Sequence, residues 1–129
     1  MNKEELGKRI SDFLRDDDKE IAHSIFVETQ KYIGEFGQYD ISLKAKYDGL
    51  FCSPFYSTNE CYFMFQNRKL SFKLENRKII IIQSNEEKHS GYLVDEIAVE
   101  NGIANCKHGK FEIRVIDKYL TECFAELVN

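Results

Sequence analysis

The chain has 129 residues, of which 43% are hydrophobic and 31% charged, and its formal net charge is −4 at pH 7. This balance excludes an intrinsically disordered chain, and the length is that of one ordinary domain. The acidic charge also argues against binding of nucleic acid over a broad surface, because such proteins concentrate positive charge. We therefore expect one folded domain spanning residues 1–129.

The sequence has the features of a cytoplasmic protein without a membrane segment. No apolar run approaches the ~18 residues of a membrane-spanning helix, and the charged first residues contain no apolar stretch typical of a secretory signal. The four cysteines form no CxxC pair and are Cys52, Cys61, Cys106 and Cys123. We expect these thiols to be reduced and mostly buried.

Residues 1–37 carry helical periodicity and are predicted to form two helices. The first has an apolar stripe made of Leu6, Ile10, Phe13 and Leu14. Aspartates then interrupt the pattern, and Asp17 with Glu20 matches an acidic capping box that starts a second helix. The apolar face of that helix comprises Ile21, Ala22, Ile25, Phe26, Thr29, Tyr32, Ile33 and Phe36. The helix is predicted to end near Gly34 or Gly37, where glycine allows the left-handed conformation.

The run of aspartates at residues 16–18 leaves one alternative open, which is a single long helix kinked at this point. Such a run also raises the question of a bound cation. Adjacent carboxylates on a helix point in different directions, so they do not surround one ion. We predict no metal site here.

Residues 38–116 are predicted to form an antiparallel sheet. Apolar and polar residues alternate from Ile41 to Tyr47, which indicates a half-buried strand, and Asp48-Gly49 suits a tight hairpin turn. Residues 50–59 contain the single proline, Pro54, within a cluster of turn-forming residues. They are predicted to form an edge strand that ends in a loop.

Two polar turns, each with the sequence Asn-Arg-Lys, separate three apolar runs between residues 60 and 83 and predict a three-strand meander. We place Phe65 opposite Leu70 in the first hairpin and Leu74 opposite Ile79 in the second. One face of the meander is then entirely apolar and is the predicted core face, with Cys61, Phe63, Phe65, Leu70, Phe72, Leu74, Ile79 and Ile81. The basic turns lie at opposite ends of the sheet and do not form one patch.

The opposite face of the meander is too apolar for a solvated surface and too polar for a core. Its residues are Tyr62, Met64, Ser71, Lys73, Ile80 and Ile82. Two interpretations follow from this composition. Either a helix packs on the face, or part of the face stays exposed and binds a partner, with a second copy of the chain as one candidate.

The remaining sequence predicts a loop, a hairpin, a further strand and a terminal helix. The polar loop Ser84–Gly91 is expected to be exposed, and Asn101-Gly102 predicts a tight hairpin that places Val99 opposite Ala104. Alternation from Phe111 to Val115 predicts another strand. Helical spacing then predicts a docked helix at 117–128, with Asp117 as its N-cap.

These elements predict an α+β fold with two N-terminal helices (1–37), an antiparallel meander sheet of about six to eight strands (38–116) and a C-terminal helix (117–128). We expect the helices to pack on the core face of the sheet.

Sequence motifs for catalysis are absent. Cys106 and His108 are two residues apart, but no further ligands at metal-binding spacing accompany them. A Cys-His nucleophile pair drawn from Cys52, Cys61 or Cys106 with His89 or His108 rests on residue counts alone. Nucleotide-binding and common hydrolase motifs are also missing. We predict no catalytic residue, cofactor or metal.

The leading hypothesis is a small, non-enzymatic protein-binding module of the immunity-protein, toxin- or defence-system-inhibitor, chaperone or adaptor type. Its predicted contact residues lie on the mixed sheet face and in the loop after it, and are Tyr62, Met64, Lys73, Ile80, Ile82, Glu86, Glu87 and His89. One alternative is a small-ligand-binding domain or modest enzyme with a pocket between sheet and helices. Another is a weak nucleic-acid-binding sheet face with Lys44, Lys46 and Lys73.

Overall fold

The computed structural model describes residues 1–39 and 50–129, with the backbone alone described at 38–39 and 50–52. Its helices are α1 (Lys3–Leu14), α2 (Asp17–Tyr39) and α4 (Val115–Val128). Its strands are β1 (Leu50–Ser53), β2 (Glu60–Phe65), β3 (Arg68–Glu75), β4 (Lys78–Asn85), β5 (Ser90–Glu100), β6 (Ile103–Cys106) and β7 (Gly109–Lys110). The predicted strand from Ile41 to Tyr47 and the turn at Asp48-Gly49 lie outside the described residues.

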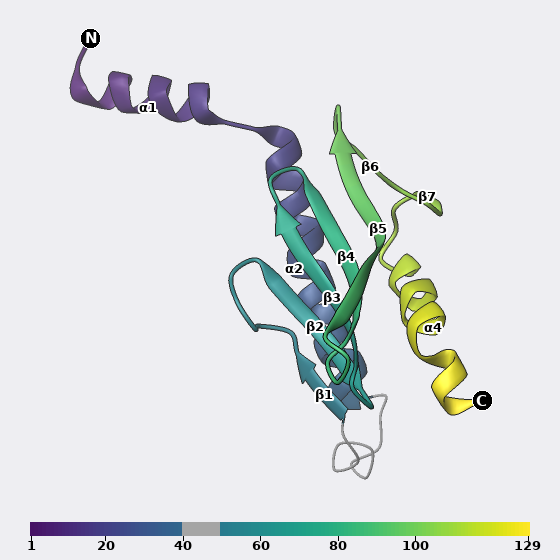
Figure 1. The fold of residues 1–129 in the computed structure, drawn as a ribbon. Coiled ribbons are helices and arrows are strands. Elements are labelled where there is room, and N and C mark those ends of the chain that lie inside the picture. Colours follow the sequence, from purple (N-terminus) through teal and green to yellow (C-terminus); the bar gives the residue numbers. More distant parts are fainter. Residues whose placement is uncertain (40–49) are drawn as a thin grey trace.

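The described strands form one antiparallel meander in the order β1 to β7, and the last strand has only two residues (Figure 1). This confirms the predicted α+β fold with two N-terminal helices, an antiparallel sheet and a C-terminal helix. Each strand follows its neighbour through a short hairpin connection, apart from the longer β1–β2 loop. Local pairing of this kind follows from the closely spaced turns in the sequence.

The hairpin registers test the predicted pairings directly. Leu74 lies opposite Ile79, as predicted, but Phe65 lies opposite Arg68 and not Leu70. The first turn has only two residues, Gln66 and Asn67, which both adopt positive φ, whereas the prediction assumed four. Side chains alternate between faces along a strand, so an error of two residues leaves every face assignment intact.

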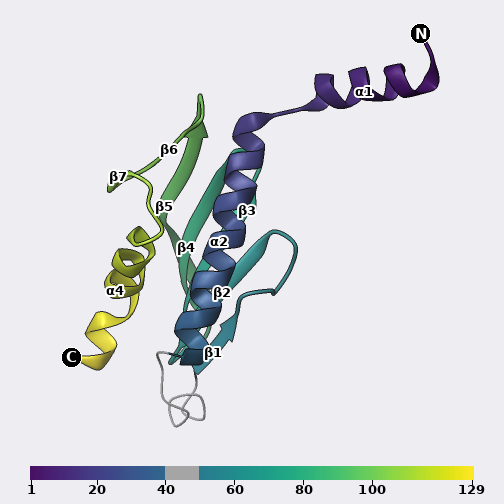
Figure 2. The same cartoon turned by 180° about the vertical axis from the view of Figure 1, so that it is seen from behind.

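The core lies between one sheet face and the helices α2 and α4 (Figures 1 and 2). The predicted core face is confirmed, because six of its residues are buried and Phe65 and Leu74 pack at its margin. From the helices, Phe26 and Ile33 of α2 and Tyr119 of α4 are fully buried against it. Both helices therefore cover the same side of the sheet.

Helix α2 runs to Tyr39, beyond the predicted end at Gly34 or Gly37. Gly34 serves packing and not termination, because a Cβ atom there would meet the side chain of Pro54 at 3.4 Å. The helix is also capped one residue earlier than predicted. Oδ1 of Asp16 accepts the hydrogen bond from the backbone N–H of Lys19 at 3.1 Å, which satisfies a free donor of the first turn.

The predicted strand from Phe111 to Val115 is wrong. Backbone hydrogen bonds from Val115 to Glu112 and from Ile116 to Ile113 close successive turns that lead into α4. Phe111 and Ile113 still pack against the core, since such turns can also direct alternate side chains inward. Helix α4 begins at Val115, so Asp117 lies in its first turn and is not its N-cap.

The expected loop at Ser84–Gly91 is shorter than predicted. Strand β4 continues to Asn85 and β5 begins at Ser90, which leaves only Glu86–His89 as a turn. Hydrogen bonding between the two strands extends further than the polar composition indicated. By contrast, the Asn101-Gly102 turn is confirmed, with both residues at positive φ and Val99 opposite Ala104.

Helix α1 departs from the expectation that every helix packs on the core face. It has no buried residue and projects away from the sheet (Figures 1 and 2). The residue that follows it, Arg15, is extended at φ −64° and ψ 133°, which separates the direction of α1 from that of α2. Two amphipathic helices thus cover the sheet, and the third covers nothing in the described chain.

Candidate interaction site

The sheet has a second face, turned away from α2 and α4, which we call the outer face. Its central row crosses four strands through the pairs Tyr62–Ser71, Ser71–Ile82 and Ile82–Leu93. Tyr62 and Ile82 are half-buried by their neighbours, and Leu93 is 55% exposed. The described helices α2 and α4 both pack on the other face of the sheet, and Ser71 in the middle of the row is buried between its strand neighbours.

A second row of the outer face is charged. It runs through the pairs Glu60–Lys73, Lys73–Ile80 and Ile80–Glu96. Nζ of Lys73 lies 3.7 Å from Oε1 of Glu75, so its charge has an acidic neighbour. The predicted basic surface is not formed by this row, and Lys44 and Lys46 lie outside the described residues.

Tyr62 is an aromatic residue of the outer face with two side-chain neighbours that contact its ring. Its ring meets Tyr56 edge-on at a centroid distance of 5.3 Å, and Nζ of Lys69 lies 4.7 Å from its centroid. Lys69 also lies 3.4 Å from Glu86, which connects the predicted loop to the face. The sequence did not single out Tyr56 or its exposed neighbour Phe55, although two aromatic residues directly after Pro54 were a signal for them.

The structure therefore unites most of the predicted contact residues. Tyr62, Met64, Lys73, Ile80 and Ile82 share the outer face, because strand residues of equal parity point the same way. In the following turn, Glu86 approaches the face through Lys69. Glu87 and His89 are exposed in that turn and form no hydrogen bond or ion pair with the face among the described residues.

A polar cluster lies at the junction of α4 with β5 and β6. The hydroxyl of Tyr119 donates to Oδ2 of Asp95 at 2.5 Å, and the backbone N–H of Lys107 donates to the same oxygen at 3.0 Å. Burial, supported by the hydrogen bond to Asp95, raises the pKa of Tyr119 far above its ordinary value. The ring therefore stays protonated and acts as a hydrogen-bond donor that docks α4.

Cysteine and histidine form no nucleophile pair in the described residues. Cys106 lies close enough to Tyr119 to raise the pKa of its hydroxyl, while Nε2 of His108 lies 3.4 Å from Oε1 of Glu122. Cys61 and Cys123 are buried in the core, and burial raises the pKa of Cys123 to about 12. A protonated thiol is a poor nucleophile, so Cys123 is suited to packing and not to catalysis.

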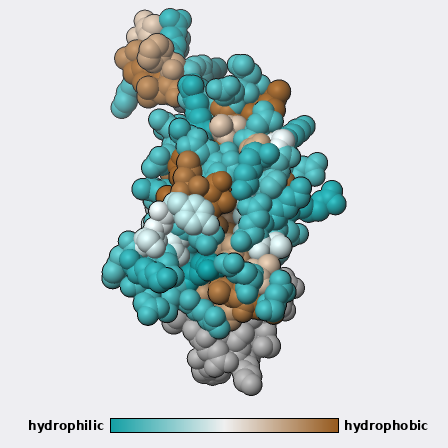
Figure 3. Space-filling model, turned by 45° about the vertical axis from the view of Figure 1, so that its right-hand side comes forward, coloured by the Kyte–Doolittle hydropathy of each residue, from teal (hydrophilic) through white to brown (hydrophobic). Residues whose placement is uncertain are grey.

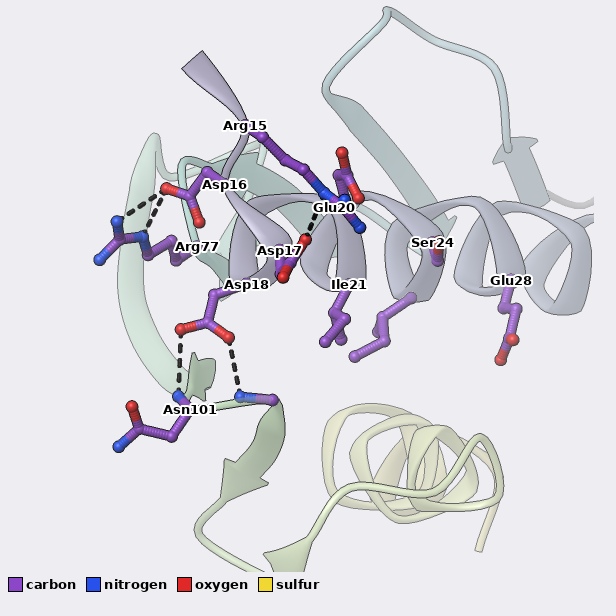
Figure 4. A pocket seen from close by; sticks show the side chains of 12 residues that line it. Arg15, Asp16, Asp17, Asp18, Glu20, Ile21, Ser24, Glu28, Arg77 and Asn101 are labelled. Atoms are coloured by element: carbon purple, nitrogen blue, oxygen red, sulfur yellow. Dashed lines mark hydrogen bonds and ion pairs between the residues drawn. The ribbon is translucent and has the colours of Figure 1, made fainter. Parts of the chain in front are cut away.

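The aspartates at the start of α2 bind two hairpin turns. Oδ2 of Asp16 contacts Nε and Nη2 of Arg77 at 2.8 and 2.7 Å, and the hydrogen bond from Arg77 lowers the pKa of Asp16. Asp18 accepts from the backbone N–H groups of Asn101 and Gly102 at 3.0 and 2.8 Å (Figure 4). The sequence signals, an aspartate run and two turns, were visible, but their contact depends on residues more than 60 positions apart.

Beside these contacts lies a groove of about 1030 Å³. It runs along α2 next to the β5–β6 turn, and the side chains of Ile21, Ser24 and Glu28 point into it (Figure 4). Ile21 and Ile25 provide its apolar lining, and Glu20 adds a further carboxylate. We call it the α2 groove.

The apolar stripe of α1 is exposed along its whole length. Phe13 and Leu14 are 87% and 71% exposed, and Leu6 and Ile10 are 50% exposed. Figure 3 shows these apolar side chains gathered on the projecting helix. An isolated helix of this length is only marginally stable in water, so the stripe is suited to a contact that the described chain does not supply.

Comparisons of the chain with protein-family models, with curated proteins and with solved structures found no match. Among the described residues, no helix combines the length and apolar character needed to cross a membrane. The same part of the chain contains no cluster of three or more His, Cys, Asp or Glu side chains arranged to hold a metal ion.

Proposed function

We propose that the chain is a small, non-enzymatic, cytoplasmic protein-binding module that recognises another protein through the outer face. The observation that carries the proposal is the row from Tyr62 to Leu93, which neither α2 nor α4 covers although both pack on the opposite face. Immunity proteins, inhibitors of toxins or defence systems, chaperones and adaptors are the classes that this kind of recognition fits.

The composition of the outer face supports a protein partner. Interface cores are apolar and rich in aromatic residues, while charged groups lie at the rim. The row with Tyr62 and Ile82 has the apolar and aromatic composition of an interface core, and the neighbouring row with Lys73 and Glu96 has the charges of a rim. Tyr56 and Lys69 hold the ring of Tyr62 in place, so little rotamer freedom is lost when a partner binds.

The proposal is tested with Ile82→Asp, which places a charge in the centre of the outer face, and with the matched control Val27→Asp. Val27 is 47% exposed on α2 and is not part of the outer face. Immobilised wild-type chain and both variants are incubated with extract of the source cells, and the retained proteins are quantified by mass spectrometry.

We expect the wild type and Val27→Asp to retain the same protein, and Ile82→Asp to retain at least roughly tenfold less of it, since a charge in an apolar contact is left desolvated and unpaired. Tyr62→Ala is expected to act in the same direction. Equal retention by all of these chains would contradict recognition through the outer face.

A further inference from the structure

Helix α1 and the α2 groove are two surfaces of the same chain that no other described element covers. The helix has twelve residues, and the part of α2 that lines the groove, from Asp17 to Glu28, has the same number. Both segments are therefore ~18 Å long at the helical rise of 1.5 Å per residue. The apolar stripe of α1 matches the groove in length, and the groove has an apolar lining of Ile21 and Ile25.

The charges that border the two surfaces are complementary. By helical spacing, Lys3 lies one turn before Leu6 and Arg9 one turn before Phe13, so both bases flank the stripe. Glu4, Lys8 and Asp12 lie on the opposite side of α1.

The lining of the α2 groove is acidic on balance, because it contains five carboxylates against the two bases Arg15 and Arg77. Glu20 and Glu28 line it, and the structure records no ion pair for either within the described residues. Lys3 and Arg9 likewise have none there. Within the described part of the chain, these charges on each surface thus have no ion-pair partner, and the charges of the other surface can pair with them.

Helix α1 is directed away from the groove of its own chain. The link between the helices is Arg15 and Asp16, and both are fixed by contacts: Nε of Arg15 lies 2.8 Å from Oδ1 of Asp17, and Asp16 binds Arg77. Closure onto the same chain requires this short link to reverse direction. Short hinges of this kind favour exchange of an element between identical chains.

A membrane surface fits α1 less well. Helices that lie on membranes have a polar face rich in lysine and arginine. The residues from Lys3 to Leu14 contain three bases and three acids, and Arg15 and three aspartates follow. The balanced charge supplies no attraction for anionic lipid, whereas bases next to the stripe suit an acidic groove.

We propose that α1 of one copy occupies the α2 groove of a second copy, and that the second copy returns the same contact in a two-fold dimer. Reciprocal exchange buries two stripes and two grooves, which together are on the order of the 1,200–2,000 Å² typical of stable interfaces. This contact is separate from the outer face. A result that rejects the exchange of α1 therefore leaves the proposed function untouched, and a result that rejects recognition through the outer face leaves the exchange of α1 untouched.

The first experiment measures the mass of the full chain in solution by sedimentation velocity over a range of concentrations. The helix variant is Phe13→Asp, and the groove variant carries Glu20→Lys together with Glu28→Lys. All three side chains are exposed, so these changes leave the fold intact. The matched control is Phe55→Asp, because Phe55 is 76% exposed on a loop outside both surfaces.

We expect the wild type and Phe55→Asp to form a dimer, and the helix and groove variants to associate on the order of 30-fold more weakly. A monomeric wild type overturns the proposal, and this result includes the case in which α1 closes onto its own chain. A dimer that is insensitive to either variant also overturns it.

Mixing the two variants distinguishes exchange from direct pairing of one α1 with another. The helix variant retains an intact groove, and the groove variant retains an intact α1, so the mixture restores one of the two contacts. We expect mixed dimers at concentrations where each variant alone is monomeric. A mixture that stays monomeric overturns the placement of α1 in the groove.

Discussion

Helices α1 and α4 are both amphipathic, yet they differ completely in burial. The stripe of α4 includes Ile116, Tyr119 and Cys123, which are fully buried or nearly so, while α1 has no buried residue. A periodic apolar stripe tells which side of a helix avoids water, but it does not specify the surface that covers that side. The difference marks α4 as part of the core, whereas α1 is the helix for which we propose a contact with a second copy of the chain.

The largest expected effect comes from truncating one isoleucine in each helix. Ile116→Ala should lower the free energy of unfolding by about 2–5 kcal/mol, because it leaves a cavity in the core. Ile10→Ala should change it by less than about 0.5 kcal/mol at concentrations where the chain is monomeric. Urea denaturation monitored by circular dichroism measures both. Equal losses would show that α1 contributes to the core of its own chain, and they would contradict the difference in burial between α1 and α4.

A smaller change in the free energy of unfolding is expected from removing the polar contact that docks α4, a kind of contact that α1 lacks among the described residues. Tyr119→Phe removes the donor to Asp95 and should cost about 1–3 kcal/mol at neutral pH. The pKa of Tyr119 is raised by folding, so its contribution is complete below the ordinary pKa of 10.0 and is lost as pH rises above it. The variant should therefore lose less stability than the wild type as pH rises from about 9 to about 11, which is about one unit on either side of the ordinary tyrosine pKa.

Chemical denaturation at each pH measures this difference. The control is Tyr92→Phe, since the Tyr92 side chain is exposed and bonds Gln83 outside the α4 contact. An alkaline profile that is identical for wild type and Tyr119→Phe would contradict the role given to the hydroxyl.

The smallest effect concerns the junction from which α1 projects. Asp16→Asn keeps an N-cap side chain but removes the charge that pairs with Arg77. The pKa of Asp16 is depressed, so its contribution is present above the ordinary value of 3.8 and is lost as pH falls below it. The variant should be less stable than the wild type at pH 6, and the two should converge in acid. Thermal unfolding across this pH range measures the difference in stability between the two chains. A difference that persists at pH 2 would mean that the ion pair with Arg77 is not its cause.

The sequence predicted most of the sheet because its signals are local. The Asn101-Gly102 turn and the alternation around Phe72 depend on residues close in the chain, and both were confirmed. The error at Phe65 shows the limit of this reasoning, since a turn of two residues and one of four leave the same faces apolar. The incorrect strand at Phe111 has a related cause, because alternating burial also occurs in successive turns.

The candidate site was also predicted only in part. The alternation of side chains along the strands placed Tyr62 and Ile82 on one face, but it did not show whether a helix covers that face. The contact of Asp16 with Arg77, the ring of Tyr56 beside Tyr62 and the α2 groove also escaped prediction. Each of them joins segments that are brought together only when the chain folds.

The sequence by itself determined which side of each strand and helix is apolar, because hydrophobic periodicity is written in neighbouring residues. Only the tertiary structure decided how those sides are paired. Among the described residues, it put α2 and α4 on the same face of the sheet, placed no helix on the outer face, and separated the direction of α1 from that of α2 at Arg15. The physical reason is that burial depends on contacts between residues far apart in the chain, and one amphipathic pattern satisfies many such arrangements.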